Sequence, residues 1–157
     1  MHGTEPDCSC CIPFFKGMGE GVVSNDPYTI LVVEDEPWIR LALVQHLEEC
    51  NFHVLEAASV REAITALENR AVTLVFTDLR LLGERDGIEL ARWVAQNRPG
   101  VPVMLASGEI GQVKALQELC HAEGFIPFSK PFVHAAVSAQ ILELIEKRKS
   151  GAAGTTP

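Results

Sequence analysis

The sequence predicts an α/β fold, a doubly wound parallel sheet made of five strand–helix units. Short apolar runs alternate with longer segments of helical period, which is the pattern of repeated strand–helix units. Some of these runs are apolar at every position, as expected of strands that helices cover on both faces. The length of 157 residues, with 47% hydrophobic and 22% charged side chains, fits one globular domain and excludes two.

The five predicted strands differ in their apolar character. Residues 30–33 are apolar throughout and residues 74–77 nearly so, which favours central positions. Residues 53–57 include Glu56, and residues 125–128 include Pro127, which has no N–H to give to a neighbouring strand. Both are therefore predicted at sheet edges. The fourth strand, residues 103–106, follows a segment rich in proline and glycine.

Apolar residues at three- and four-residue steps predict a helix after each strand. The first begins at Pro37, the second has Ser59 as N-cap with Glu62 completing a capping box, and the third opens at Asp86 and Gly87. The predicted apolar faces are Ile39, Leu43, Leu47 and Cys50; Ala63, Ile64, Leu67 and Ala71; Ile88, Ala91, Val94 and Ala95; Val113, Leu116, Leu119 and Cys120; and Val133, Val137, Ile141 and Leu144.

Outside these units the sequence loses its period. Residues 1–26 contain scattered glycines and prolines, and we expect a flexible N-terminal extension. The folded domain is predicted over residues 27–149, with a disordered tail over residues 150–157. Cys8, Cys10 and Cys11 lack a fourth ligand for a closed zinc site, so we interpret them as free thiols.

Composition restricts the class of partner. The net charge of -8 argues against nucleic acid, because neutralising phosphates requires clustered lysine and arginine. The sequence has no run of about eighteen apolar residues that could span a membrane and no secretory signal, and its odd number of cysteines indicates reduced thiols. We expect a cytoplasmic protein with a protein or cation partner.

Chemically active side chains follow four of the predicted strands. Glu34, Asp35 and Glu36 follow the first strand, and Asp78 follows the third. Ser107 follows the fourth and Lys130 the fifth. In an open parallel sheet, ligands bind beyond the carboxyl ends of the strands, so we expect these groups at one rim.

Three converging carboxylates repel one another unless a cation lies between them. Mg²⁺ (or Mn²⁺) prefers oxygen ligands, and together with Lys130 it would cancel the formal charge of Glu34, Asp35 and Asp78. Such a site can accept a phosphoryl group, because that transfer depends mainly on positioning and electrostatics. Asp78 is then the predicted nucleophile.

The chain resembles the receiver domain of two-component response regulators, and in particular the stand-alone receivers of alphaproteobacteria. The resemblance covers roughly residues 28–147 and rests on four motifs: Ile30-Leu31-Val32-Val33-Glu34-Asp35-Glu36, Thr77-Asp78-Leu79-Arg80, Ser107-Gly108 and Lys130-Pro131-Phe132. It implies a flavodoxin-like fold of five strand–helix units with strand order 2-1-3-4-5.

The resemblance also implies a role for each site residue. Asp78 would take the phosphoryl group from the phosphohistidine of a sensor histidine kinase. Metal ligands would be Asp35 and Asp78, the backbone carbonyl of Arg80 and, mostly through water, Glu34. Ser107 and Lys130 would each contact a phosphoryl oxygen, and the Lys130–Pro131 peptide would be cis.

Three departures from the family pattern stand out. The acidic pair is Glu-Asp where Asp-Asp is commoner, and the loop after Asp78 is one residue longer, with Leu82 where proline is usual. The family's switch aromatic stands three residues before the lysine, at Pro127 in this chain. Strand alternation favours Phe125 over Phe128 as its substitute, and the alternative is that both belong to the core.

The predicted function is that of a single-domain response regulator. It would hydrolyse the phosphoryl group on Asp78 only slowly, and we expect no other enzymatic activity. Its signal would leave through protein contacts with a downstream or phosphotransfer partner, or by draining phosphate from the kinase. Two alternatives remain: a docking module that is never phosphorylated, and a phosphatase with an aspartate nucleophile. Arg80 disfavours the phosphatase, because it stands where such enzymes place a second aspartate.

Overall fold

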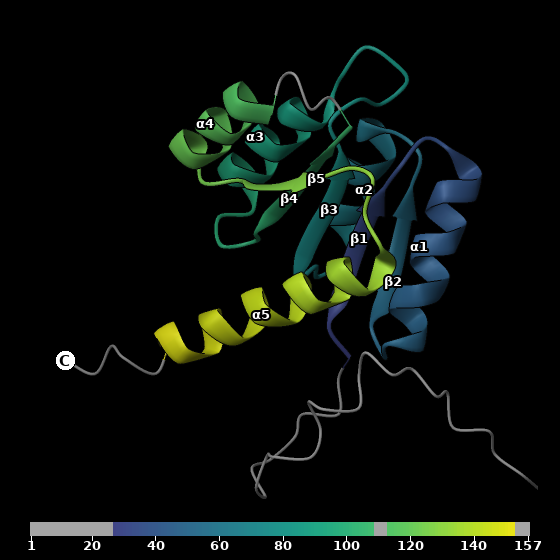
Figure 1. Ribbon diagram of the computed structural model, residues 1–157, viewed down its shortest axis with the longest axis vertical. Helices are drawn as coiled ribbons and strands as arrows, with labels where there is room; N and C mark the ends of the chain where they lie inside the picture. The colour runs from purple at the N-terminus through teal and green to yellow at the C-terminus, as the bar shows by residue number, and fades with distance from the viewer. Residues whose placement is uncertain (1–26, 109–112, 153–157) are drawn as a thin grey trace, which may run out of the picture.

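The computed structural model describes residues 27–108 and 113–152. Five parallel strands form one sheet in the order β2-β1-β3-β4-β5, alternating along the chain with five helices (Figure 1). The predicted fold class and strand order are confirmed, with β2 and β5 at the edges. The bounds are β1 Thr29–Val33, α1 Pro37–Glu49, β2 His53–Ala57, α2 Val60–Asn69, β3 Leu74–Asp78, α3 Gly87–Asn97, β4 Val103–Ser107, α4 Val113–Glu123, β5 Ile126–Ser129 and α5 His134–Ala152.

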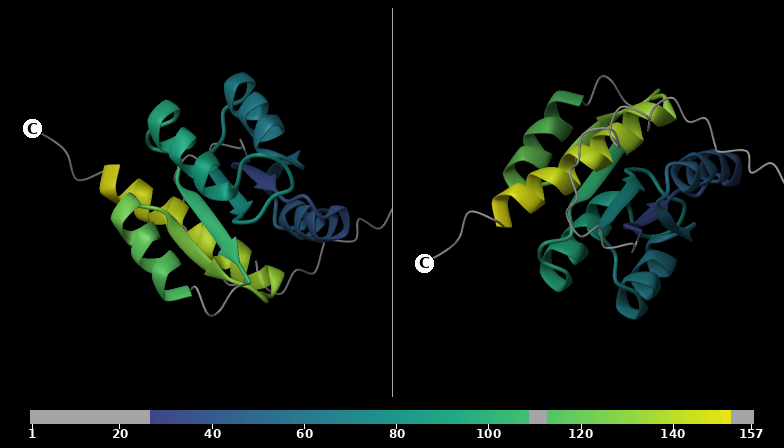
Figure 2. Two further views of the ribbon diagram at one scale, coloured as in Figure 1. Left: turned by 90° about the horizontal axis from the view of Figure 1, so that it is seen from above. Right: turned by 90° about the horizontal axis from the view of Figure 1, so that it is seen from below.

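Helices cover both faces of the sheet (Figure 2). Alternation along β1 sends Ile30 and Val32 into one core, which they share with residues of α1 and α5. Leu31 and Val33 enter the other core with residues of α2, α3 and α4. All four side chains are inaccessible to solvent, which explains why this strand is apolar at every position.

The helix N-termini follow the sequence signals, with one change. Ser59 caps α2 by accepting a hydrogen bond from the Glu62 N–H. The Glu62 carboxylate accepts from the Ala58 N–H and not from that of Ser59, so the predicted capping box is displaced by one residue. A complete box forms at α3, where Asp86 and Glu89 each accept from the other's backbone N–H.

Some predicted apolar faces are wrong at their ends. Ile39 is 43% exposed, because the buried stripe of α1 consists of Leu43, Val44 and Leu47, and Arg40 continues it into the first turn. Val133 precedes α5 and is 69% exposed. Ala95 is exposed, and Ala71 is exposed and lies beyond the end of α2.

Several boundaries also differ from the prediction. β5 begins at Ile126, so Phe125 lies just before the strand. Strands β3 and β4 extend to include Asp78 and Ser107. Helix α5 continues to Ala152, three residues past the predicted end of regular structure. The single glycine in this stretch, Gly151, costs only about 1 kcal/mol relative to alanine and does not end the helix. Cys8, Cys10, Cys11 and the rest of the predicted extension lie outside the described residues.

Within residues 27–108 and 113–152, no helix is both long enough and apolar enough to cross a membrane.

Candidate functional site

The parallel register brings the predicted site residues to one edge of the sheet. Val33 pairs with Thr77, so Glu34 and Asp78 leave β1 and β3 at the same level. Asp78 pairs with Ala106, one residue before Ser107. Ser107 pairs with Ser129, one residue before Lys130, and its carbonyl accepts from the Lys130 N–H at 2.8 Å. The carboxyl ends of these four strands therefore lie side by side.

Three carboxylates converge in this pocket. Glu34, Asp35 and Asp78 each offer an oxygen, and these oxygens lie within 4.8 Å of one another. In the part of the chain that the structure describes, this is the one group of three or more acidic, histidine or cysteine ligands so close together. Glu34 is buried and the other two are half-buried, so their repulsion is not fully screened by water.

Lys130 supplies the compensating charge. Its Nζ lies 2.9 Å from Asp78 Oδ2 and 3.4 Å from Glu34 Oε2. Burial alone would lower the pKa of Lys130, but the hydrogen bond and charge of Asp78, with those of Glu34, raise the pKa above its ordinary value. The lysine therefore stays charged throughout the neutral range.

Glu34 has a different balance. Burial raises the pKa of Glu34, and the charge of Asp78 adds to that rise. The backbone N–H of Glu36, which donates to Oε1 at 3.1 Å, and the charge of Lys130 act in the opposite direction. Both Glu34 oxygens thus already have partners within the protein, which suits a ligand that acts through water more than one that binds a cation directly.

The donor set fits a hard divalent cation. Carboxylate oxygens are the ligands that Mg²⁺ uses in proteins, usually one or two of them with water completing the shell. Asp35 and Asp78 are open enough to supply them, and a cation would relieve the repulsion among the three acids. Arg80, whose backbone carbonyl is the fourth predicted ligand, is an exposed residue of the loop after β3.

The backbone of Asp78 is packed tightly against the start of α3. Gly87 donates its N–H to the Leu79 carbonyl at 2.9 Å, and Leu79 donates to Ala106 at 2.8 Å. A Cβ on Gly87 would clash with the Asp78 carbonyl oxygen. In the sequence Gly87 is recognisable only as a helix start, because its close contact with Asp78 has no local signature.

The remaining predicted residues are placed as follows. Ser107 is 6% exposed at the end of β4, and the Lys130–Pro131 peptide is cis. Phe125 belongs to the core with Leu116 and Cys120 of α4. Phe128 lies against the opposite face of the sheet. Its ring centroid is 6.1 Å from that of Phe76 and 5.4 Å from that of Phe132.

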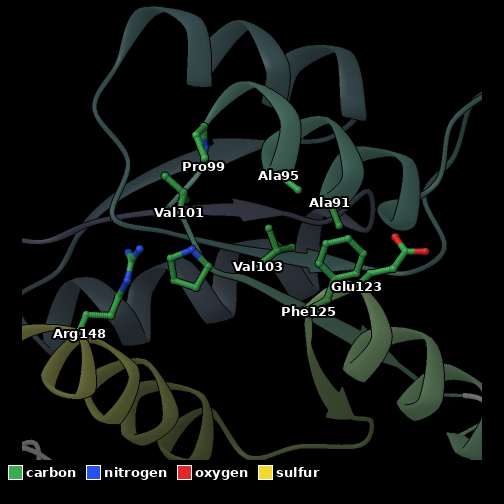
Figure 3. A pocket seen from close by; sticks show the side chains of 11 residues that line it. Ala91, Ala95, Pro99, Val101, Val103, Glu123, Phe125 and Arg148 are labelled. Atoms are coloured by element: carbon green, nitrogen blue, oxygen red, sulfur yellow. The ribbon is translucent and has the colours of Figure 1, made fainter. Parts of the chain in front are cut away.

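A separate groove lies at the opposite end of the strands, beside the start of β4 and β5 (Figure 3). Its volume is about 330 Å³, and it lies beside Val103 and Phe125, where β4 and β5 begin. Its lining is mostly apolar, with Arg148 at one side and Glu123 at the other. Arg92 already binds Glu123 through two nitrogens, at 2.7 and 2.9 Å. This groove has no part in the carboxylate pocket.

Comparison with known proteins agrees with this geometry. The sequence model of the response regulator receiver domain matches residues 30–142. The chain is 32% identical over 123 residues to the sensor kinase CckA of Brucella abortus, covering 76% of this chain and 13% of that protein. It is 30% identical over 128 residues to the transcriptional regulatory protein GlrR of Escherichia coli, covering 80% and 28%. The chain thus spans a minor part of both relatives.

A shorter relative and two solved structures extend the comparison. The response regulator receiver protein CpdR of Brucella abortus is 34% identical over 79 residues, covering 50% of this chain and 65% of that protein. A response regulator receiver protein from Sinorhizobium medicae has a TM-score of 0.68 at 29% identity, covering 80% of this chain and 99% of that one. A CheY-like receiver domain from Methanospirillum hungatei, at 23% identity and a TM-score of 0.73, supports the fold alone. It covers 80% of this chain and 99% of that one.

With five parallel strands in the order 2-1-3-4-5 and an acidic pocket at their carboxyl ends, the chain belongs to the response regulator receiver domain family.

Proposed function

We propose that this receiver domain accepts a phosphoryl group from the phosphohistidine of a sensor histidine kinase onto Asp78, in a reaction that depends on Mg²⁺ or Mn²⁺. The observation that carries the proposal is the position of Asp78. Its carboxylate ends β3 beside Glu34 and Asp35 and is bound by Lys130 at 2.9 Å. Carboxylates and a lysine in this arrangement can balance the charge of an incoming phosphoryl group.

In the proposed reaction, an Asp78 carboxylate oxygen forms a bond to phosphorus while the bond from phosphorus to the histidine nitrogen breaks. The product is an acyl phosphate on Asp78 and a neutral histidine on the kinase. Asp35, Asp78 and the Arg80 carbonyl would hold the cation, with Glu34 acting through water. The cation, when bound, supplies positive charge that offsets the charge developing on the phosphoryl oxygens.

Two residues are proposed to contact the phosphoryl group. Lys130 would exchange its bond to Asp78 for one to a phosphoryl oxygen, and its raised pKa keeps it charged for this purpose. Ser107, at the end of β4, would offer its hydroxyl to another oxygen. Ser107 and Lys130 lie at the ends of the neighbouring strands β4 and β5, so both contacts would act on these two strand ends.

The signal is proposed to leave through the face formed by α4 and β5. Phosphorylation would add charge at the pocket, and Ser107 and Lys130 would pass this change to the neighbouring α4–β5 face. Phe125, packed in the core with α4 residues, is the favoured aromatic relay, with Phe128 the alternative. The readers would be a downstream protein or a phosphotransfer partner, and hydrolysis of the acyl phosphate would be slow.

Two other functions compete with this proposal. A docking module that is never phosphorylated would use the same fold, but it would not need Asp35, Asp78 and Lys130 to converge. A phosphatase of this kind would need a second aspartate, as general acid, two residues after Asp78, and this chain has the exposed Arg80 there. Turnover of small phosphate esters would favour the phosphatase.

The test is incubation with acetyl phosphate, with and without Mg²⁺, followed by intact mass. We expect one added phosphoryl group that requires the metal and is absent in Asp78→Asn. The matched control is Asp86→Asn, at an exposed acid that caps α3, because asparagine is an equally good N-cap and α3 stays intact. A phosphoryl group that persists in Asp78→Asn would refute the site assignment.

A further inference from the structure

We propose that Arg40 is a positioning residue for the metal-binding carboxylates: its guanidinium fixes the peptide that joins Glu34 to Asp35. The inference rests on the proposed function, since it concerns the cation that would bind there. It gives a role to a residue in the first turn of α1 that has no place among the predicted site residues.

The contacts of Arg40 lie on both sides of the acidic loop. Its Nη1 donates to the Glu34 backbone carbonyl at 2.6 Å. Its Nε donates to Glu56 Oε2 at 3.3 Å, and Glu56 lies near the end of the neighbouring strand β2. The Arg40 side chain is only 19% exposed, whereas that of Glu56 is 50% exposed. The guanidinium therefore joins the ends of β1 and β2 through a partly buried bond to the carbonyl and an exposed bond to Glu56.

The bond to the carbonyl constrains Asp35 through the planarity of the peptide. The Glu34 carbonyl shares one plane with the N and Cα of Asp35, so holding the oxygen fixes the direction in which Asp35 leaves the loop. The Glu34 N–H is held from the other side by the Ala57 carbonyl at 3.1 Å. With both backbone groups of Glu34 held, the two carboxylates start from a defined backbone.

The residue type suits this task. Arginine presents several N–H groups in a rigid plane, so one side chain can serve a carbonyl and a carboxylate in different directions. Lysine offers a single point charge and cannot keep both contacts at these distances. Arg40 also lies three and four residues before Leu43 and Val44, which places it on the buried stripe of α1. The side chain is thus mostly shielded from solvent while its guanidinium reaches the loop.

Removing Arg40 should therefore weaken metal binding more than it weakens the fold. Residues that orient metal ligands without touching the metal typically contribute about 10- to 100-fold to affinity. We expect Arg40→Ala to lower the affinity for Mg²⁺ by roughly 10-fold, at the low end of that range, because Asp35 and Asp78 are retained. Arg40→Lys should lie between wild type and Arg40→Ala.

The experiment is calorimetric titration of the full chain with MgCl₂, repeated for each variant, with thermal unfolding in EDTA as a separate measure of stability. Arg92→Ala is the matched control, since Arg92 also binds a carboxylate, that of Glu123, but lies on α3 away from the pocket. We expect Arg92→Ala to bind Mg²⁺ as wild type does. Glu56→Gln removes the ion pair but keeps the carbonyl contact, and it should change the affinity by less than about 3-fold.

A second readout separates positioning from chemistry. With acetyl phosphate as donor, Arg40→Ala should need about 10-fold more Mg²⁺ for half-maximal phosphorylation of Asp78 but should reach the wild-type rate at saturation. Unchanged Mg²⁺ affinity in Arg40→Ala, or an equal loss in Arg92→Ala, would overturn the proposal. If wild type binds Mg²⁺ no better than Asp35→Asn does, the proposed function itself fails, and the role of Arg40 fails with it.

Discussion

Lys130 Nζ lies 2.9 Å from Asp78 Oδ2, although 52 residues separate the two in the chain. The contact joins the ends of two strands that are not neighbours, because β4 lies between β3 and β5. A change in the charge of Asp78 therefore acts directly on Lys130, at the end of β5. This relationship gives the first prediction.

We expect Lys130→Ala to accept a phosphoryl group on Asp78 but to lose the conformational response. Without the ammonium group, no cation links the modified aspartate to β5 and, through β5, to α4. The measurement is amide hydrogen exchange over α4 before and after phosphorylation. Lys147→Ala is the control, because Lys147 is an exposed residue of α5 paired with Glu143. An exchange response in Lys130→Ala equal to that of wild type would contradict the prediction.

A second prediction concerns the two candidate aromatic residues. Phe125 shares a core with Leu116 and Cys120 of α4, whereas Phe128 packs near Phe76 and Phe132 on the other face. We expect Phe125→Leu to reduce the exchange response of α4 more than Phe128→Leu does, because only the first ring lies on the α4 side. Equal effects of the two substitutions would indicate that both rings serve only the core.

A third prediction follows from the contact of Gly87 with Asp78. Gly87→Ala places a methyl group against the Asp78 carbonyl and within 3.1 Å of Leu105 Cδ2. We expect a loss of about 1–3 kcal/mol in the free energy of unfolding, as for other overpacked sites, together with slower phosphorylation. Denaturant unfolding and the phosphorylation assay provide the two measurements.

Gly151→Ala is the control for Gly87→Ala. Gly151 lies in α5 with open space around the position of a Cβ, so the change should be neutral or slightly stabilising. If Gly87→Ala unfolds at the same denaturant concentration as Gly151→Ala, the close packing of Asp78 against α3 does not require glycine at position 87, and the prediction is wrong.

A fourth prediction concerns pH. His46 of α1 faces α5: its Nε2 lies 3.1 Å from Ser138 Oγ, and its ring centroid lies 5.6 Å from that of His134. Burial and then the neighbouring His134 lower the pKa of His46 below 6.5, against a weaker opposing effect of Glu49. As pH falls below about 6.5, the unfolded chain therefore binds this proton before the folded chain does, so stability falls.

The measurement compares thermal unfolding of wild type and His46→Gln between pH 5 and pH 7.5. Glutamine is neutral and keeps a donor for Ser138. Wild type should lose stability relative to His46→Gln as the pH falls through 6.5, and the difference should level off below the folded pKa. A constant difference across this range would show that burial does not disfavour the charged imidazole.

The sequence by itself determined the architecture, because the signals that place each strand lie within that strand. Apolar runs covered on both faces identified β1 and β3 as central, while Glu56 and Pro127 identified β2 and β5 as edge strands. Because parallel strands end at one edge, the same reasoning predicted that Glu34, Asp35, Asp78 and Lys130 meet.

Tertiary structure alone decided which backbone groups hold that site in place. The bond of Arg40 to the Glu34 carbonyl and the packing of Gly87 against Asp78 depend on how α1 and α3 lie against the strand ends. It also packed Phe125 against Leu116 and Cys120 of α4 and left Ile39 exposed. Hydrophobic period specifies which face of an element is buried, but contacts between elements depend on their relative placement, which no local pattern of residues encodes.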